Sequence, residues 1–146
     1  MSNTISVELD REIAPINRDI FGGFAEHLGR CIYGGIYEPD SPLAAEDGLR
    51  SDVLDALRRL NMPVMRYPGG NFVSGYRWRD GVGPADERKI RMELAWHDLK
   101  PNTFGTNEFI DFCRKINSEP YMAVNCGDGH MREARDWLEY CNGTKD

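Results

Sequence analysis

The spacing of hydrophobic positions changes several times along the chain, and each spacing predicts a different element. Residues 5–10 (ISVELD) alternate apolar and polar side chains, which is the period of a half-buried strand. Residues 20–28 form an apolar, glycine-containing stretch that predicts a short buried strand. Residues 63–67 and 121–124 are compact apolar runs that end at proline, glycine or asparagine, and they predict two more strands.

Three longer segments place apolar side chains on one face of a helix. In residues 49–60 these side chains fall at relative positions 0, 4, 5, 8 and 11, and Asn-Met-Pro at 61–63 ends the helix. A second helix is expected over residues 106–116, with Thr106 as its N-terminal cap. The third covers residues 131–141, and Asn142-Gly143 is suited to end it.

The order strand, helix, strand, helix, strand, helix predicts an α/β fold in which helices cover a parallel sheet. A closed barrel of eight such units takes about 250 residues, whereas only three units are visible here. The pattern leaves two architectures open, a small open α/β sheet or the front part of a barrel. Polar side chains follow the predicted strands at Glu26, at 66–71 and at 125–128, where parallel α/β proteins carry their functional sites.

Charge and composition exclude several classes of protein. The 146 residues include 18 Lys and Arg against 24 Asp and Glu, a formal net charge of −6, and no basic stripe. This balance argues against a nucleic-acid or anionic-membrane partner. No apolar run approaches the roughly 20 residues that span a membrane. The acidic start does not resemble a secretory signal, so we expect a cytoplasmic protein.

Cysteine and histidine spacing gives no metal or redox motif. The four cysteines, at 31, 113, 126 and 141, contain no Cys-x-x-Cys pair, and the three histidines are scattered. We therefore expect no metal and no cofactor, and we expect packed, reduced thiols. A basic cluster is offset by neighbouring acids and predicts a solvated face; its members are Arg77, Arg79, Arg88, Lys89 and Arg91.

Four motifs follow one another along nearly the whole chain. They are GFAEHLGRCIYGGI at 23–36, MRYPGGNF at 65–72, WRDGVGP at 78–84 and FGTNEF at 104–109. In this order and spacing they resemble the N-terminal part of glycoside hydrolase family 51, the intracellular α-L-arabinofuranosidases. Each motif alone is weak evidence, but four in register are specific.

The resemblance implies a (β/α)8 barrel that begins with residues 18–146, and a β-sandwich domain to which residues 1–17 contribute a strand. It implies hydrolysis of terminal arabinofuranosyl groups from arabinan, arabinoxylan and their oligosaccharides, with retention of configuration, by a homo-oligomer. Family members carry the acid/base in an Asn-Glu pair after the fourth barrel strand and the nucleophile after the seventh. Both positions fall outside the three units seen here, so we assign no catalytic residue.

Asn107-Glu108 is an Asn-Glu pair too, but it falls in the first turn of a predicted helix. A carboxylate there is stabilised by the helix dipole, and we expect it to face away from the strand ends. We therefore reject Glu108 as the acid/base and predict that the chain alone is inactive.

Four residues match positions that surround the sugar in the family, and a fifth, Asn125, ends the third predicted strand beside them. Glu26 matches a sugar-binding glutamate, and we expect it in a wet cleft where its carboxylate can accept hydroxyl hydrogen bonds. Asn71 matches an asparagine whose amide both donates and accepts, and Trp96 a tryptophan that can stack on a sugar face. Arg66 matches an arginine near the nucleophile. Asn125 is expected to hydrogen-bond around the site rather than to contact the sugar.

Each of these residues has a plainer alternative: a solvated loop acid, a turn asparagine, a packed aromatic or a structural ion pair. At the level of the chain, three functions compete. One is a fragment of an arabinofuranosidase completed by a complementary polypeptide. Another is a sugar-binding or scaffold fragment that oligomerises. The third, a nucleotide-binding domain with a phosphate loop at 69–71, lacks both G-x-G-x-x-G and G-K-[ST].

Overall fold

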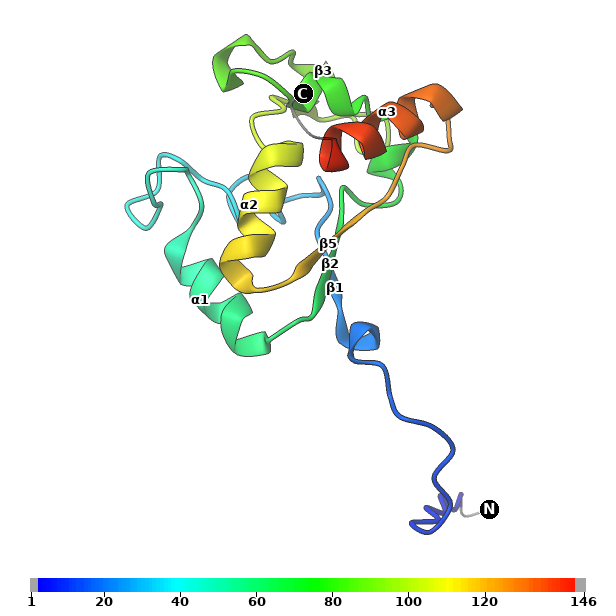
Figure 1. The fold of residues 1–146 in the computed structure, drawn as a ribbon. Helices are drawn as coiled ribbons and strands as arrows, with labels where there is room; N and C mark the ends of the chain where they lie inside the picture. The colour runs from blue at the N-terminus through cyan, green and yellow to red at the C-terminus, as the bar shows by residue number, and fades with distance from the viewer. Residues whose placement is uncertain (1–2, 144–146) are drawn as a thin grey trace.

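A computed structural model describes residues 3–143 of the chain (Figure 1). Its centre is a three-stranded parallel sheet of β1 (Gly23–Phe24), β2 (Val64–Tyr67) and β5 (Glu119–Met122), in the order β1-β2-β5. The predicted α/β fold with a parallel sheet is thus confirmed. The two outer strands lie elsewhere than expected, since β1 is much shorter than 20–28 and β5 begins two residues before 121.

Three α-helices follow the strands, as the hydrophobic spacing predicts: α1 (Ser51–Leu60), α2 (Thr106–Ile116) and α3 (Met131–Asn142). The first two end at asparagines in the left-handed conformation, Asn61 and Asn117, because asparagine tolerates positive φ better than most residues. Thr106 is not the cap of α2. The cap is Gly105, and the Thr106 hydroxyl instead accepts a 3.0 Å hydrogen bond from the indole N–H of Trp137 on α3.

Helices α1 and α2 lie on one face of the sheet (Figure 1). The buried core beneath them is rich in aromatic side chains. Met65 and Tyr67 of β2 point into this core and are buried. Side chains alternate along a strand, so Arg66 points to the opposite face. In the register of the sheet it lies between Phe24 and Tyr121, which are 59% and 57% exposed. One face of the sheet is therefore packed and the other is uncovered.

The segment that joins β2 to α2 contains several short elements. It holds three 3-10 helices, η2 (Phe72–Gly75), η3 (Trp78–Gly81) and η4 (Ala85–Glu87). It also holds an antiparallel hairpin of β3 (Arg91–Met92) and β4 (Leu99–Lys100). Elements this short have too few residues to show a period, so the sequence pattern does not reveal them.

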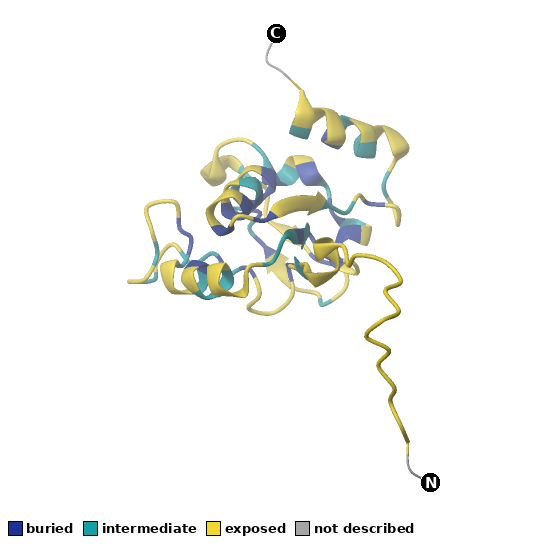
Figure 2. Ribbon diagram, turned by 60° about the horizontal axis from the view of Figure 1, so that its bottom comes forward, coloured by how far each residue is buried: buried dark blue, intermediate teal, exposed yellow. Residues whose placement is uncertain are grey.

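Residues 3–17 form no strand, and all are exposed (Figure 2). They lead into a short 3-10 helix, η1 (Arg18–Phe21), in the region where a buried strand was expected. A strand needs a neighbour for its N–H and C=O groups, and the described residues provide none for Ile5, Val7 or Leu9. The assignment of 1–17 to a β-sandwich stays a prediction, and residues 1 and 2 lie outside the described part.

The cysteines only partly follow the expectation of packed thiols. Cys113 is buried, and burial raises the pKa of its thiol to about 12. Cys141 is half-buried, whereas Cys31 and Cys126 are exposed. Among the helices of the described residues, none has the length and apolar character needed to cross a membrane.

Candidate functional site

Four of the five predicted site residues, all but Trp96, lie at or near the carboxyl edge of the sheet, where β1, β2 and β5 end. Beyond the strands, the Ala25 N–H donates to the Arg66 carbonyl at 2.8 Å, and the Ala123 N–H donates to the Tyr67 carbonyl at 2.7 Å. These bonds hold the first residues after each strand side by side. They place Glu26, the loop at 68–72 and Asn125 at one edge.

Glu26 is only 8% exposed, so the expected wet cleft is wrong for this side chain. Its Oε1 accepts hydrogen bonds from the backbone N–H groups of Gly70, at 2.9 Å, and Phe72, at 3.2 Å. Gly69 makes this approach possible: its φ is +126°, and a Cβ there would lie 2.2 Å from Glu26 Cγ. The second oxygen, Oε2, makes no hydrogen bond to the described residues.

Arg66 and Asn71 belong to the same loop. The guanidinium of Arg66 donates to the Gly69 carbonyl at 2.9 Å, and its carbon lies 5.8 Å from the Phe24 ring centroid. Asn71 precedes η2 and is exposed, and its side chain makes no capping hydrogen bond. Glu26, Arg66 and Asn71 are thus connected through the backbone of 69–72, with the Asn71 amide available to solvent.

Asn125 is buried, and its amide is fully used within the protein. Its Nδ2 donates to the Tyr76 carbonyl at 3.1 Å and to Asp128 Oδ1 at 2.9 Å. Its Oδ1 accepts from the N–H groups of Gly127 and Gly129. Asn125 therefore hydrogen-bonds within the protein, and its place around a sugar site stays a prediction.

Trp96 lies in the turn between β3 and β4, outside the cluster of Glu26 and Asn71. It is half-buried and packs against the core. The buried carboxylate of Glu93 shapes this turn by accepting from the N–H groups of Ala95, at 2.5 Å, and Trp96, at 2.7 Å. Leu94 of the same turn packs close to Gly75, so the hairpin rests on the loop that follows β2.

Arg88 contradicts the solvated face expected of the basic cluster, because its side chain is only 3% exposed. Its guanidinium donates to both carboxylate oxygens of Glu108, at 2.8 and 3.0 Å, and to the carbonyls of Gly83, Asn102 and Thr103. Glu108 also accepts from the Gly105 N–H at 2.8 Å, at the start of α2. The structural role predicted for Glu108 is confirmed by these contacts.

His27 was not singled out by sequence reasoning, although it follows Glu26 directly. Its Nε2 lies 3.0 Å from the Tyr67 hydroxyl, and its ring stacks on Phe72 at 4.3 Å. Burial, assisted by the charge of Lys100, lowers the pKa of His27 to about 3, so the imidazole is neutral at pH 7. Its position inside the GFAEHLG motif was the one available signal.

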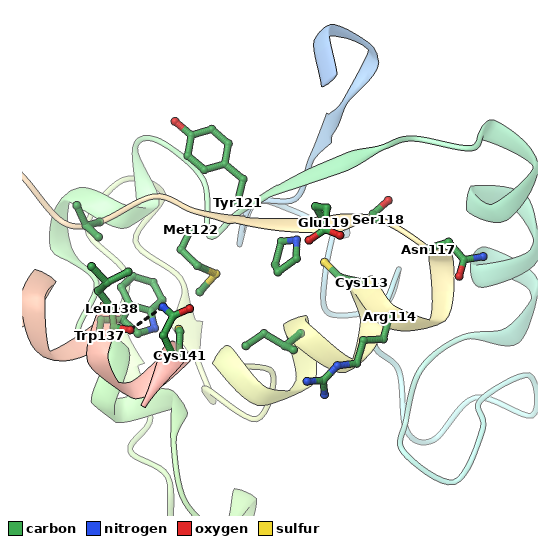
Figure 3. A pocket seen from close by; sticks show the side chains of 14 residues that line it. Cys113, Arg114, Asn117, Ser118, Glu119, Tyr121, Met122, Trp137, Leu138 and Cys141 are labelled. Carbon is green, nitrogen blue, oxygen red and sulfur yellow. Dashed lines mark hydrogen bonds between the residues drawn. The ribbon is translucent and has the colours of Figure 1, made fainter. Parts of the chain in front are cut away.

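A groove of about 840 Å³ runs along the free edge of β5, between α2 and α3 (Figure 3). Met122 and Cys113 form part of its floor, and Leu138 lies on the α3 side. None of the five predicted site residues lines it. The groove is an uncovered flank of the sheet, separate from the polar carboxyl edge.

Residues 56–146 match the sequence profile described as the alpha-L-arabinofuranosidase 1 domain. The chain belongs to this arabinofuranosidase family. It is 57% identical over 143 residues to the probable alpha-L-arabinofuranosidase C of Aspergillus fumigatus, covering 98% of this chain and 28% of that protein. It is 49% identical to an intracellular exo-alpha-(1->5)-L-arabinofuranosidase of Acetivibrio thermocellus, covering 94% and 27%.

Solved arabinofuranosidase structures have the same fold over this segment. The GH51 enzyme from Thermotoga petrophila RKU-1 superposes with a TM-score of 0.89 at 57% identity, covering 92% of this chain and 28% of that one. The Thermotoga maritima arabinofuranosidase in its arabinose complex superposes with a TM-score of 0.82 at 59% identity, covering 84% and 25%. The resemblance to family 51 is confirmed, and the chain spans about 28% of the length of the curated relatives it matches.

Proposed function

We propose that the chain supplies sugar-binding residues to a retaining α-L-arabinofuranosidase. The complete enzyme would remove terminal arabinofuranosyl groups from arabinan and arabinoxylan oligosaccharides. The observation that carries the proposal is the Glu26 carboxylate, which two backbone N–H groups orient through Oε1 while Oε2 makes no hydrogen bond to the described residues. A carboxylate oxygen held in this way can accept hydrogen bonds from ring hydroxyls.

Two neighbours fit the same role. The exposed amide of Asn71 can donate to one hydroxyl and accept from the next, and it lies one residue from both backbone donors that hold Glu26. Arg66 projects from the uncovered face of the sheet, where its positive charge would keep a neighbouring glutamate ionised. Trp96 offers a flat apolar surface on the hairpin turn for a sugar face.

The uncovered face and the groove beside β5 support a barrel that residues 18–143 begin. Phe24 and Tyr121 are exposed on the face that would become the barrel interior, and the free edge of β5 has unpaired backbone groups. In a (β/α)8 barrel, further strands would cover both features. The proposal assigns the exposed residues 3–17 to a β-sandwich, where a strand partner would satisfy their backbone.

The retaining reaction needs two carboxyl groups about 5–5.5 Å apart, one as acid and one as nucleophile. Glu26 accepts hydrogen bonds from the backbone of 70–72, and Glu108 forms an ion pair with Arg88. Asp128 is hydrogen-bonded to Asn125 and paired with Arg77, and these contacts lower its pKa, which is unfavourable for an acid that must donate a proton. The proposal therefore places both catalytic glutamates beyond these residues, in a complementary part of the polypeptide.

A cytoplasmic enzyme is part of the proposal. It is supported by the name of the Acetivibrio thermocellus relative, which is described as intracellular. Assembly as a homo-oligomer is proposed from the family resemblance.

The test is a chimera in which this chain replaces the segment that it matches in the Thermotoga petrophila enzyme. We expect the chimera to hydrolyse an aryl α-L-arabinofuranoside with retention, whereas residues 1–146 alone give no turnover. A folded chimera without activity would contradict the proposal. Turnover by the purified chain that survives re-purification would place the catalytic pair within it. Arabinose binding without hydrolysis by a stable oligomer of the 16.6 kDa chain would favour the scaffold alternative.

A further inference from the structure

The loop that follows β5 is fastened to the loop that follows β2. The Asp128 N–H donates to the Ser74 carbonyl at 3.1 Å, and Asn125 Nδ2 donates to the Tyr76 carbonyl. The two loops also touch, since a Cβ at Gly127 would lie 2.7 Å from the Ser74 carbonyl oxygen. These contacts align 125–129 with 74–76.

Arg77 closes this junction. Its guanidinium donates to both carboxylate oxygens of Asp128, at 2.9 and 3.1 Å, and to the Asp128 carbonyl at 3.4 Å. Glu133 of α3 lies 3.7 Å from the same guanidinium. Two parallel N–H···O bonds fix the direction as well as the distance of the pair, which a single contact between exposed side chains does not.

Arg77 and Asn71 are the two ends of one short segment. Only η2 and Tyr76 lie between them, and Phe72 and Tyr76 at either end of that stretch are buried. A short packed segment of this kind moves as a unit, because its buried rings resist bending. A shift at Arg77 therefore reaches Asn71 and the Phe72 N–H that holds Glu26.

We propose that Arg77 and Asp128 form a clasp that positions Asn71, and with it the Glu26 carboxylate, for the arabinofuranosyl ring. The inference rests on the proposed function. Arg77 and Asp128 are positioning residues and do not contact the sugar. Releasing the clasp loosens the binding edge, so substrate and transition state lose affinity together.

The test is Arg77→Met in the chimera, which removes the charge pair and keeps an apolar stem of similar length. We expect KM for the aryl arabinofuranoside to rise about three- to tenfold with kcat changed less than about twofold, the pattern of lost uniform binding. Arg77→Lys should recover part of the loss, because an ammonium still reaches Asp128 with one bond.

Arg79→Met is the matched control. Arg79 pairs with Asp136 of α3 at 2.6 Å and also stacks on Trp78 at 4.5 Å, so its loss should lower Tm at least as much. It lies beyond the clasp, and KM should stay unchanged. Equal KM values in Arg77→Met and the unaltered chimera, or equal rises in Arg77→Met and Arg79→Met, would overturn the proposal.

Hydrogen exchange tests the clasp independently of the proposed function, because it needs no enzyme activity. Backbone amides in 70–76 and 125–129 should exchange faster in Arg77→Met than in Arg79→Met, because the Asp128 N–H and its neighbours lose their support. An inactive unaltered chimera would contradict the proposed function, and the exchange comparison would still decide the clasp. Identical exchange in the two variants would refute it.

Discussion

Replacing Glu26 separates its two roles, because each carboxylate oxygen has a different task. In Glu26→Gln the amide oxygen can still accept from the N–H groups of Gly70 and Phe72, while the outer oxygen becomes an NH2 group. The loop should keep its shape. Sugar hydroxyls lose a charged acceptor, which we expect to cost about 2–4 kcal/mol of transition-state stabilisation, roughly a 30- to 1000-fold drop in kcat/KM.

Glu26→Ala removes the acceptor as well. The Gly70 N–H can turn to water because Gly70 is exposed, but the Phe72 N–H belongs to a buried residue. An orphaned buried donor costs about 1–3 kcal/mol. We therefore expect Glu26→Ala to lose the same activity as Glu26→Gln and, in addition, to lower the free energy of unfolding by that amount.

The assay is kcat/KM on an aryl arabinofuranoside with the Tm of each variant, all in the chimera. Glu46→Gln is the control, since Glu46 is an exposed acid of the β1–α1 connection with no hydrogen bond from its side chain to the described residues. Near-normal kcat/KM in Glu26→Gln would show that the sugar site lies elsewhere. Equal Tm values for Glu26→Ala and Glu26→Gln would show that the Glu26 bonds do not support the loop.

Three further expected outcomes concern the stability and solubility of the fold. Arg88→Met should lower the free energy of unfolding by about 3–5 kcal/mol, because it leaves Glu108 and three carbonyls without their cation; unfolding in urea measures this, and a loss under 1 kcal/mol would refute it. The pKa of His27 is about 3 in the folded protein and 6.5 in the unfolded chain. The stability that its burial as a neutral group provides is therefore complete above pH 6.5 and is lost as the pH falls toward 3, at up to about 1.4 kcal/mol per pH unit. In unfolding measured against pH, His27→Gln should reduce that slope. Residues 1–146 alone should be insoluble, molten or oligomeric because apolar side chains and a strand edge are uncovered; a monomer with a sharp thermal transition would contradict this.

Local periodicity was sufficient to predict the parallel α/β fold, the three helices and the position of β2. Their signals are contained within segments of about ten residues, since a helix face or a buried run shows itself in its own spacing. The motifs around Glu26 and Asn71 indicated the family, which the match of residues 56–146 to the arabinofuranosidase profile confirms. The same motifs brought attention to the residues that the fold collects at the carboxyl edge.

Which side chains are buried and what they bind depends on partners that are distant in the sequence. In the sequence Arg88 is indistinguishable from the surface cations around it. Only the fold brings it into contact with Glu108, twenty residues away. The burial of His27 depends on Tyr67 and Phe72, and the use of Glu26 as a loop acceptor depends on Gly69, whose positive φ admits its side chain. Residues 5–10 have the alternating pattern of a strand but are exposed and form none. Alternation determines which side chains a strand would bury, whereas burial itself requires a neighbouring strand or layer to pack against.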